Sequence, residues 1–78
     1  MRAKEERFIV TFYTTAEAMA LEKLCRERSL PGKCISAPRD ISADCGIAWS
    51  APREAEDEIR RAVQETGLEI QGYFVRWV

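Results

Sequence analysis

A strand pattern runs directly into a helix start in the stretch Phe8-Ile9-Val10-Thr11-Phe12-Tyr13-Thr14-Thr15-Ala16-Glu17. Its first six residues are aromatic or β-branched, which is typical of a strand. Thr14 and Glu17 then have the spacing of a capping box, in which each side chain binds the other residue's backbone N–H at a helix start. We expect the helix to reach about Ser29, because apolar residues recur at the helical period: Ala18, Leu21, Leu24 and Cys25.

The rest of the chain predicts two more strands, a second helix and a final strand. The short alternating segment 33–37 and the apolar segment 46–50 are typical of strands. Pro52 suits the first turn of a helix, and Gly67 suits its end. The segment 69–78 alternates in strand fashion. The second helix carries apolar residues at the helical period: Ala55, Ile59, Ala62 and Val63.

In a chain of 78 residues, the order β-α-β-β-α-β predicts one domain, residues 1–78, with the α+β ferredoxin-like fold. We expect a four-stranded antiparallel sheet with two helices on one face. The other face would then be bare and lined by Tyr13, Tyr73 and Trp77. An exposed aromatic surface of this kind suits a homodimer, unless these side chains are shared between the core and the sheet edge.

The charge balance argues against two classes of protein. Twelve Lys and Arg residues against thirteen Asp and Glu residues give a net charge of −1, whereas nucleic-acid-binding domains usually carry a basic surface. No apolar run is long enough to span a membrane. The charged start, residues 1–7, lacks the apolar region of a signal peptide. We therefore expect a cytoplasmic protein that binds neither nucleic acid nor membranes.

The chain has three cysteines and no histidine, which limits its thiol chemistry. The spacing of Cys25, Cys34 and Cys45 matches no Cys-x-x-Cys metal or redox motif. A Cys–His catalytic pair is excluded within this chain. Cys25 lies on the apolar side of the first predicted helix, so we expect it in the core. We expect no metal and no cofactor, and a carrier or binding protein rather than a stand-alone enzyme.

One cysteine lies in a polar loop, Pro38-Arg39-Asp40-Ile41-Ser42-Ala43-Asp44-Cys45-Gly46. Nearby cations and backbone N–H groups stabilise a thiolate, which is the reactive form of cysteine. Arg39 offers a permanent cation, Ser42 a hydroxyl, and Gly46 an N–H and room for a close approach. The two acidic residues of the loop oppose thiolate formation. We therefore take Cys45 as the candidate reactive residue and the other three as candidate binding residues.

The pattern Pro-Arg-x-Ile-Ser-x-x-Cys-Gly, placed mid-chain in a short domain, resembles the family of selenium/sulfur carrier-like proteins. The resemblance extends from about Arg7 to Tyr73 and implies the same order of strands and helices. It also implies that Cys45 accepts sulfur or selenium as a persulfide or perselenide. The partners would then be a donor protein and an acceptor enzyme.

The hairpin register bears on a disulfide between Cys34 and Cys45. If Ala37 pairs with Gly46, then Cys34 lies beside Trp49. Three residues along a strand is about 10 Å, and a disulfide needs Cα atoms within about 7 Å. We therefore expect no bridge between these two cysteines without backbone movement.

Two alternatives to a sulfur or selenium carrier stay open. A binding or adaptor module would use the open sheet face and not Cys45, since a fold does not determine a function. A copper carrier would need thiolates from two chains, because Cu(I) prefers sulfur ligands and one cysteine lies in the loop. Arg39 has a simpler interpretation as a solvated charge or a partner of Asp44. Trp49 and Trp77 are expected to be packing residues.

Overall fold

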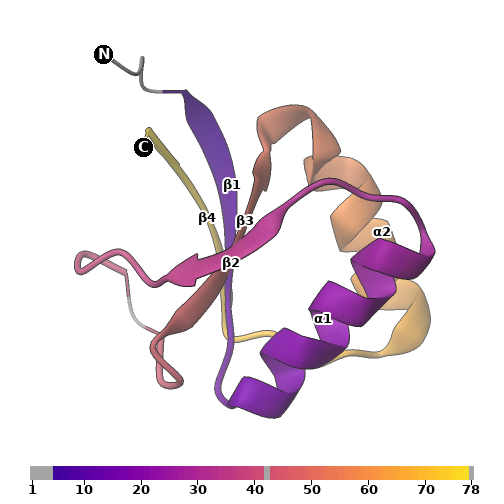
Figure 1. Cartoon of the computed structure of the whole chain (residues 1–78), viewed down its shortest axis with the longest axis horizontal. Coiled ribbons are helices and arrows are strands. Elements are labelled where there is room, and N and C mark those ends of the chain that lie inside the picture. Colours follow the sequence, from indigo (N-terminus) through magenta and orange to yellow (C-terminus); the bar gives the residue numbers. More distant parts are fainter. Residues whose placement is uncertain (1–4, 42, 78) are drawn as a thin grey trace.

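The computed structural model describes residues 5–41 and 43–77 of the chain. One antiparallel sheet has the strand order β2-β3-β1-β4, and Figure 1 shows both helices on the same side of it. This is the predicted α+β ferredoxin-like arrangement, with the elements in the predicted order. The elements are β1 (Glu6–Thr11), α1 (Thr15–Glu27), β2 (Lys33–Ser36), β3 (Ile47–Pro52), α2 (Glu56–Thr66) and β4 (Gly72–Trp77).

The predicted capping box at the start of α1 is confirmed. The backbone N–H of Glu17 donates to the Thr14 hydroxyl at 3.3 Å, and the N–H of Thr14 donates to the Glu17 carboxylate at 3.3 Å. Tyr13 also donates its N–H to this carboxylate, at 2.9 Å, so it belongs to the turn and not to β1. At the end of α2, Gly67 has a φ of 71°, the left-handed conformation that glycine adopts without strain.

The fourth strand begins at Gly72 and not at residue 69 as predicted. Leu68 and Ile70 both pack against the helix-side core, and so do Tyr73 and Val75. The spacing from residue 70 to residue 73 breaks the two-residue period of a strand. The segment 69–71 is therefore a connection, and only the residues after it alternate between the two faces.

The helix-facing side of the sheet carries the main core. Phe8 and Phe12 are fully buried there, together with Leu21 of α1 and Ile59 of α2. Cys25 belongs to the same cluster and is fully buried, as predicted. Burying aromatic and branched side chains of this size is the dominant favourable term in folding a small domain.

The opposite side of the sheet is covered by the loop that follows β2. Ile41 reaches over the sheet and packs with Ile9 and Ala48 in a second, smaller cluster. Figure 1 shows this loop on the side of the sheet away from the helices. The predicted bare aromatic face is therefore wrong, because Ile41 of the motif loop buries Ile9 and Ala48 of the two central strands on this face.

The three aromatic residues assigned to that face lie elsewhere. Tyr73 stacks on Phe8 with ring centroids 5.4 Å apart, on the helix-facing side. Tyr13 lies in the turn before α1, and Trp77 is 64% exposed near the end of β4. The burial of Tyr73 follows from its pairing with Val10, which also faces the helices.

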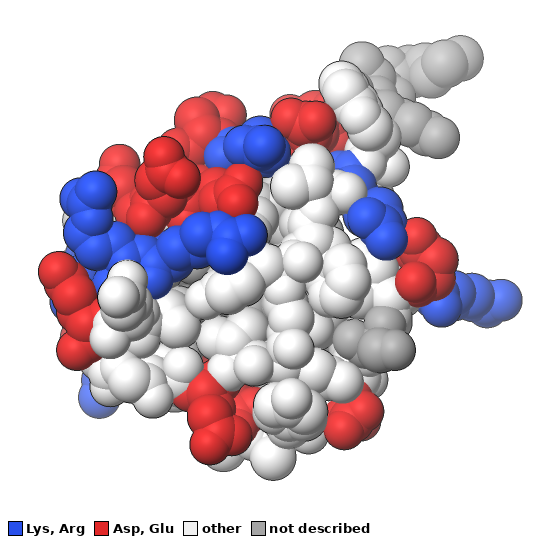
Figure 2. Space-filling view, turned by 180° about the vertical axis from the view of Figure 1, so that it is seen from behind, with Lys and Arg blue, Asp and Glu red and all other residues white. Residues whose placement is uncertain are grey.

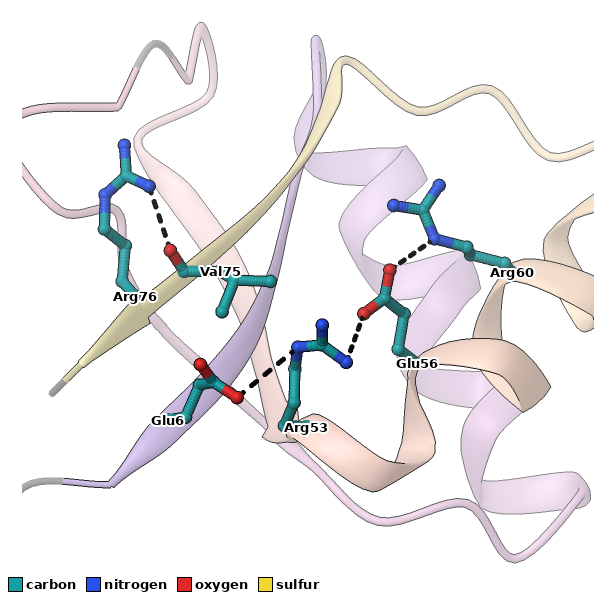
Figure 3. Close-up of polar contacts among 6 residues, drawn as sticks. All are labelled: Glu6, Arg53, Glu56, Arg60, Val75 and Arg76. Atoms are coloured by element: carbon teal, nitrogen blue, oxygen red, sulfur yellow. Dashed lines mark hydrogen bonds and ion pairs between the residues drawn. The ribbon is translucent and has the colours of Figure 1, made fainter.

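A chain of ion pairs joins β1 to α2 (Figure 3). Arg53 lies 3.6 Å from the Glu6 carboxylate and 3.0 Å from Oε1 of Glu56, the latter without hydrogen-bond alignment. Arg60 donates to the other oxygen of Glu56 at 2.8 Å, as an i,i+4 pair on the surface of α2. The Arg60 guanidinium also lies 4.2 Å from the centroid of the Tyr73 ring. Burial raises the pKa of Tyr73, and the charge of Arg60 opposes that rise.

Candidate functional site

The motif loop straddles the end of the sheet. Ile41 is anchored in the small cluster on one face, whereas Cys45 packs against the main core on the helix-facing side. Two contacts from β4 and the connection before it hold the loop between these points. Asp40 accepts a hydrogen bond from Arg76 Nε at 2.8 Å. Gln71 accepts from the Asp44 N–H at 2.9 Å and donates to its carboxylate at 3.3 Å.

The thiol of Cys45 is half-buried and has backbone groups of both polarities beside it. The N–H of Ile47 points at Sγ with an N···S distance of 3.4 Å. The S–H can donate to the Ile47 carbonyl at 3.3 Å. The Cys45 N–H donates to the Phe12 carbonyl at 3.4 Å, which places this residue beside the turn that leads into α1. The sulfur of Cys45 therefore has a backbone donor and a backbone acceptor from the same residue, Ile47, within hydrogen-bonding distance.

Gly46 follows Cys45 directly and has open space on the side where a side chain would lie. Its φ of 76° lies in the left-handed region, and a Cβ at this position would meet no atom within 4 Å. Its N–H donates to the Ala43 carbonyl at 3.0 Å and is not directed at the thiol. The N–H that faces the sulfur is that of Ile47, so the sequence indicated the right kind of donor but the wrong residue.

The other two candidate binding residues are Arg39, which the structure describes, and Ser42, which it does not. Arg39 is exposed, and its guanidinium makes no hydrogen bond or ion pair with any residue in 5–41 or 43–77. It does not pair with Asp44, whose side chain contacts Gln71. Ser42 lies outside the described residues.

Sequence reasoning missed Gln71 as a residue of the site. It lies 27 residues along the chain from Asp44 and belongs to the connection that precedes β4. A glutamine in a connection carries no pattern that distinguishes it from a solvated residue. Its own N–H donates to the Thr11 carbonyl at 2.8 Å, so β1 fixes its position beside the loop.

The environments of the other two thiols set them apart from Cys45. Burial raises the pKa of the Cys25 thiol to about 11, so it stays protonated in the core at neutral pH. Cys34 pairs with Trp49 across the hairpin, which confirms the predicted register. Partial burial raises the pKa of Cys34, and the negative charges of Glu22 and of an ionised Cys45 raise it further. Its Sγ lies 4.0 Å from the Glu22 carboxylate, and all three cysteines are free thiols.

Cys34 borders a shallow depression between α1 and β2, with a volume of about 300 Å³. Among residues 5–41 and 43–77, no three or more histidine, cysteine or acidic side chains are grouped closely enough to hold a metal ion. Neither of the described helices is long and apolar enough to cross a membrane.

Comparison with known proteins gives one match. The model of a family described as "Putative Se/S carrier protein-like" matches residues 7–75, a range that includes the motif loop, both helices and all three cysteines. No curated protein and no solved structure matches the chain.

Proposed function

This chain belongs to the family described as putative Se/S carrier protein-like, and we propose that Cys45 is the residue that carries the sulfur or selenium atom. The atom is held as a persulfide or perselenide and delivered to an acceptor enzyme. We place this activity in the cytoplasm, where thiols are kept reduced.

One observation supports Cys45 above the other two thiols: it alone combines partial exposure with a backbone N–H directed at its sulfur. Cys25 is fully buried, so a donor protein cannot reach it. Cys34 is exposed but faces the Glu22 carboxylate, which disfavours a second negative charge beside it. The open space at Gly46, the residue after Cys45, leaves room for a partner to approach the loop.

The proposed loading step is redox-neutral and needs no base within this chain. The Cys45 thiolate attacks the outer sulfur of a donor persulfide, a new S–S bond forms on Cys45, and the donor's own S–S bond breaks. The donor sulfur leaves as a thiolate, and the proton stays on the transferred atom. An acceptor thiolate then attacks that outer atom and releases Cys45. The partners supply the remaining chemistry, which suits a small domain without histidine.

The roles of the neighbouring residues follow from this step. The attacking Cys45 thiolate and the departing donor thiolate are both anions in this step, so a cation beside the loop stabilises them. Arg39 is exposed on the same loop and is the residue we assign to that role. We assign Ser42 to hydrogen bonding with the loaded group, and Gly46 to keeping the approach open.

The test is chalcogen loading followed by peptide mass mapping. The reduced protein is incubated with a cysteine desulfurase and cysteine, and separately with a selenium donor. We expect a reductant-labile addition of one sulfur or selenium atom on the peptide that contains Cys45. Cys45→Ser should abolish loading, whereas the matched Cys34→Ser variant should load normally. A Cys45→Ser protein that still carries transferable sulfur would contradict the proposal.

The adaptor alternative loses its expected surface in this structure. It relied on an open sheet face lined by Tyr73 and Trp77, but Tyr73 stacks in the helix-side core. Ile41 covers the face in question. If Cys45→Ser loses loading but still binds the donor protein, its defect lies in the chemistry and not in docking.

A further inference from the structure

The outer strand β4 is an unpaired edge with an unusually apolar sequence. It occupies one end of the strand order, and none of its residues 72–77 is fully buried. Its side chains include Tyr73, Phe74, Val75 and Trp77, with Arg76 as the one charged residue. Figure 2 views the molecule from the side on which β4 lies nearest, and an uncharged area occupies its middle, bordered by charged side chains. Long apolar edges of this kind pair with another strand unless they are protected.

The backbone of β4 presents hydrogen-bonding groups along this edge. The Val75 carbonyl accepts a hydrogen bond from Arg76 Nη1 at 2.9 Å (Figure 3), so it does not point at β1. In an antiparallel sheet, the N–H and C=O of one residue point to the same neighbouring strand, and successive residues alternate. The backbone groups of Tyr73, Val75 and Trp77 therefore face the free edge.

We propose that two copies of this chain pair antiparallel through β4, with Val75 of one copy opposite Val75 of the other. A two-fold axis perpendicular to the sheet keeps the helices of both copies on the same side. Cross-strand partners must then share a face, so this register places Tyr73 opposite Trp77 of the second copy. It also places Phe74 opposite Arg76 of the second copy.

The sequence of β4 is complementary to itself in this register. Tyr73 and Trp77 form an aromatic pair on the helix-facing side, and such pairs are favourable across strands. Phe74 and Arg76 form a cation–π pair on the other side, which repeats between copies a contact already present within one copy, where they are 5.6 Å apart. Tyr73, Val75 and Trp77, whose backbone groups face the free edge, lie opposite Trp77, Val75 and Tyr73 of the second copy. Each of these backbone N–H and C=O groups therefore has a partner.

The other edge of the sheet is less suited to pairing. β2 has only four residues, Lys33–Ser36, and three of them are exposed polar or thiol side chains. A short edge strand that carries a lysine is a typical protection against pairing. On β4 the protecting group is Arg76, whose side chain caps the Val75 carbonyl and binds Asp40. For β4 to pair, Arg76 Nη1 must release the Val75 carbonyl, whereas Arg76 Nε keeps its hydrogen bond to Asp40 on the motif loop.

The first test is sedimentation velocity of the wild-type chain over about a hundredfold range of concentration, since dimers follow mass action. We expect a concentration-dependent dimer. Trp77→Glu should shift its dissociation constant upward by about tenfold or more, because the charge replaces an aromatic partner at each end of the interface. Met19→Glu is the matched control, since Met19 is an equally exposed apolar residue on α1, at 64%. A wild-type monomer throughout, or equal effects of the two variants, would overturn the proposal.

The second test examines the register and does not depend on Trp77. Cysteine is introduced at position 75 or 77 in a chain with Cys34→Ser and Cys45→Ser, while the buried Cys25 is retained. Val75→Cys should form a disulfide-linked dimer on mild oxidation, because the two Cα atoms lie about 5.5 Å apart in a directly opposed pair. Trp77→Cys should not, since the two copies of that residue are four positions out of register. Equal crosslinking at both positions, or none at position 75, would overturn it.

The dimer is independent of the carrier function. Cys45→Ser should remain dimeric while it loses chalcogen loading, so a failure of either proposal is recognised separately.

Discussion

The two faces of the sheet are buried by different means. The helix-facing side is covered by both helices, and its cluster includes the largest fully buried side chains of the described chain, Phe8 and Phe12. The opposite side has a cluster of Ile9, Ile41 and Ala48, and Ile41 comes from the motif loop. The first face therefore provides most of the folding free energy, whereas the second mainly positions the loop that carries Cys45.

The largest effect is expected on the helix-facing side. Leu21→Ala removes a fully buried side chain of α1 and should lower the free energy of unfolding by about 2–5 kcal/mol. In a chain of 78 residues this is a large part of the total stability. Urea denaturation followed by circular dichroism measures the change. Met19→Ala, on the exposed side of the same helix, is the control and should change little. A loss below about 1 kcal/mol for Leu21→Ala would show that the helices are not the main source of stability.

Ile41→Ala should have a smaller global effect and a larger local one. The side chain is 6% exposed, but the loop around it can partly close the space, so we expect a loss of about 2 kcal/mol. Amide hydrogen exchange should become faster in the loop, and alkylation of Cys45 should become faster with it.

Cys25 serves as the internal control for that experiment, because its thiol is fully buried in the main core, on the inner side of α1. If alkylation of Cys25 and Cys45 accelerated equally, Ile41 would be part of the global core, and the division between the two faces would fail.

The sequence predicted the features that depend on neighbouring residues. The capping box of Thr14 and Glu17, the end of α2 at Gly67, and the pairing of Cys34 with Trp49 are all determined within a few residues or one hairpin. Strand and helix periods are local for the same reason. Sequence patterns of this kind are therefore reliable for the order of elements and for the ferredoxin-like fold.

The features that were missed depend on contacts between distant segments. The face on which Tyr73 lies depends on the change of phase between Ile70 and Tyr73, which a continuous strand pattern hides. The burial of Ile41 requires the loop to fold over Ile9 and Ala48. No local pattern distinguishes an isoleucine that anchors a loop from one that is exposed in it. The candidate site was therefore predicted as a set of residues in sequence, without the anchor that positions them.

Gly46→Ala tests the local backbone requirement of the loop. The alanine Cβ would meet no atom, so the cost comes from the positive φ alone, and we expect about 1 kcal/mol. Gly46→Asn should cost less, because asparagine tolerates the left-handed conformation better than other side-chain-bearing residues. Thermal denaturation of the two variants measures the difference. An alanine variant as stable as the wild type would show that the loop relaxes freely at this position.

The smallest effect concerns the ion pair that assists Ile41 on the loop-covered face. The hydrogen bond from Arg76 holds the pKa of Asp40 below its ordinary value of 3.8 in the folded state. A carboxyl group with a lowered folded-state pKa contributes stability above its unfolded pKa, and that contribution is lost as the pH falls through the folded-state value. Asp40→Asn should therefore be slightly less stable than the wild type at neutral pH, and the urea midpoints of the two proteins should converge in acid. Ile41→Ala changes no titrating group, so its loss of stability relative to the wild type should not follow this pH dependence. The two variants therefore separate apolar from ionic anchoring of the loop. A difference between Asp40→Asn and the wild type that stays constant from neutral pH into acid would mean that the Asp40–Arg76 contact does not contribute through charge.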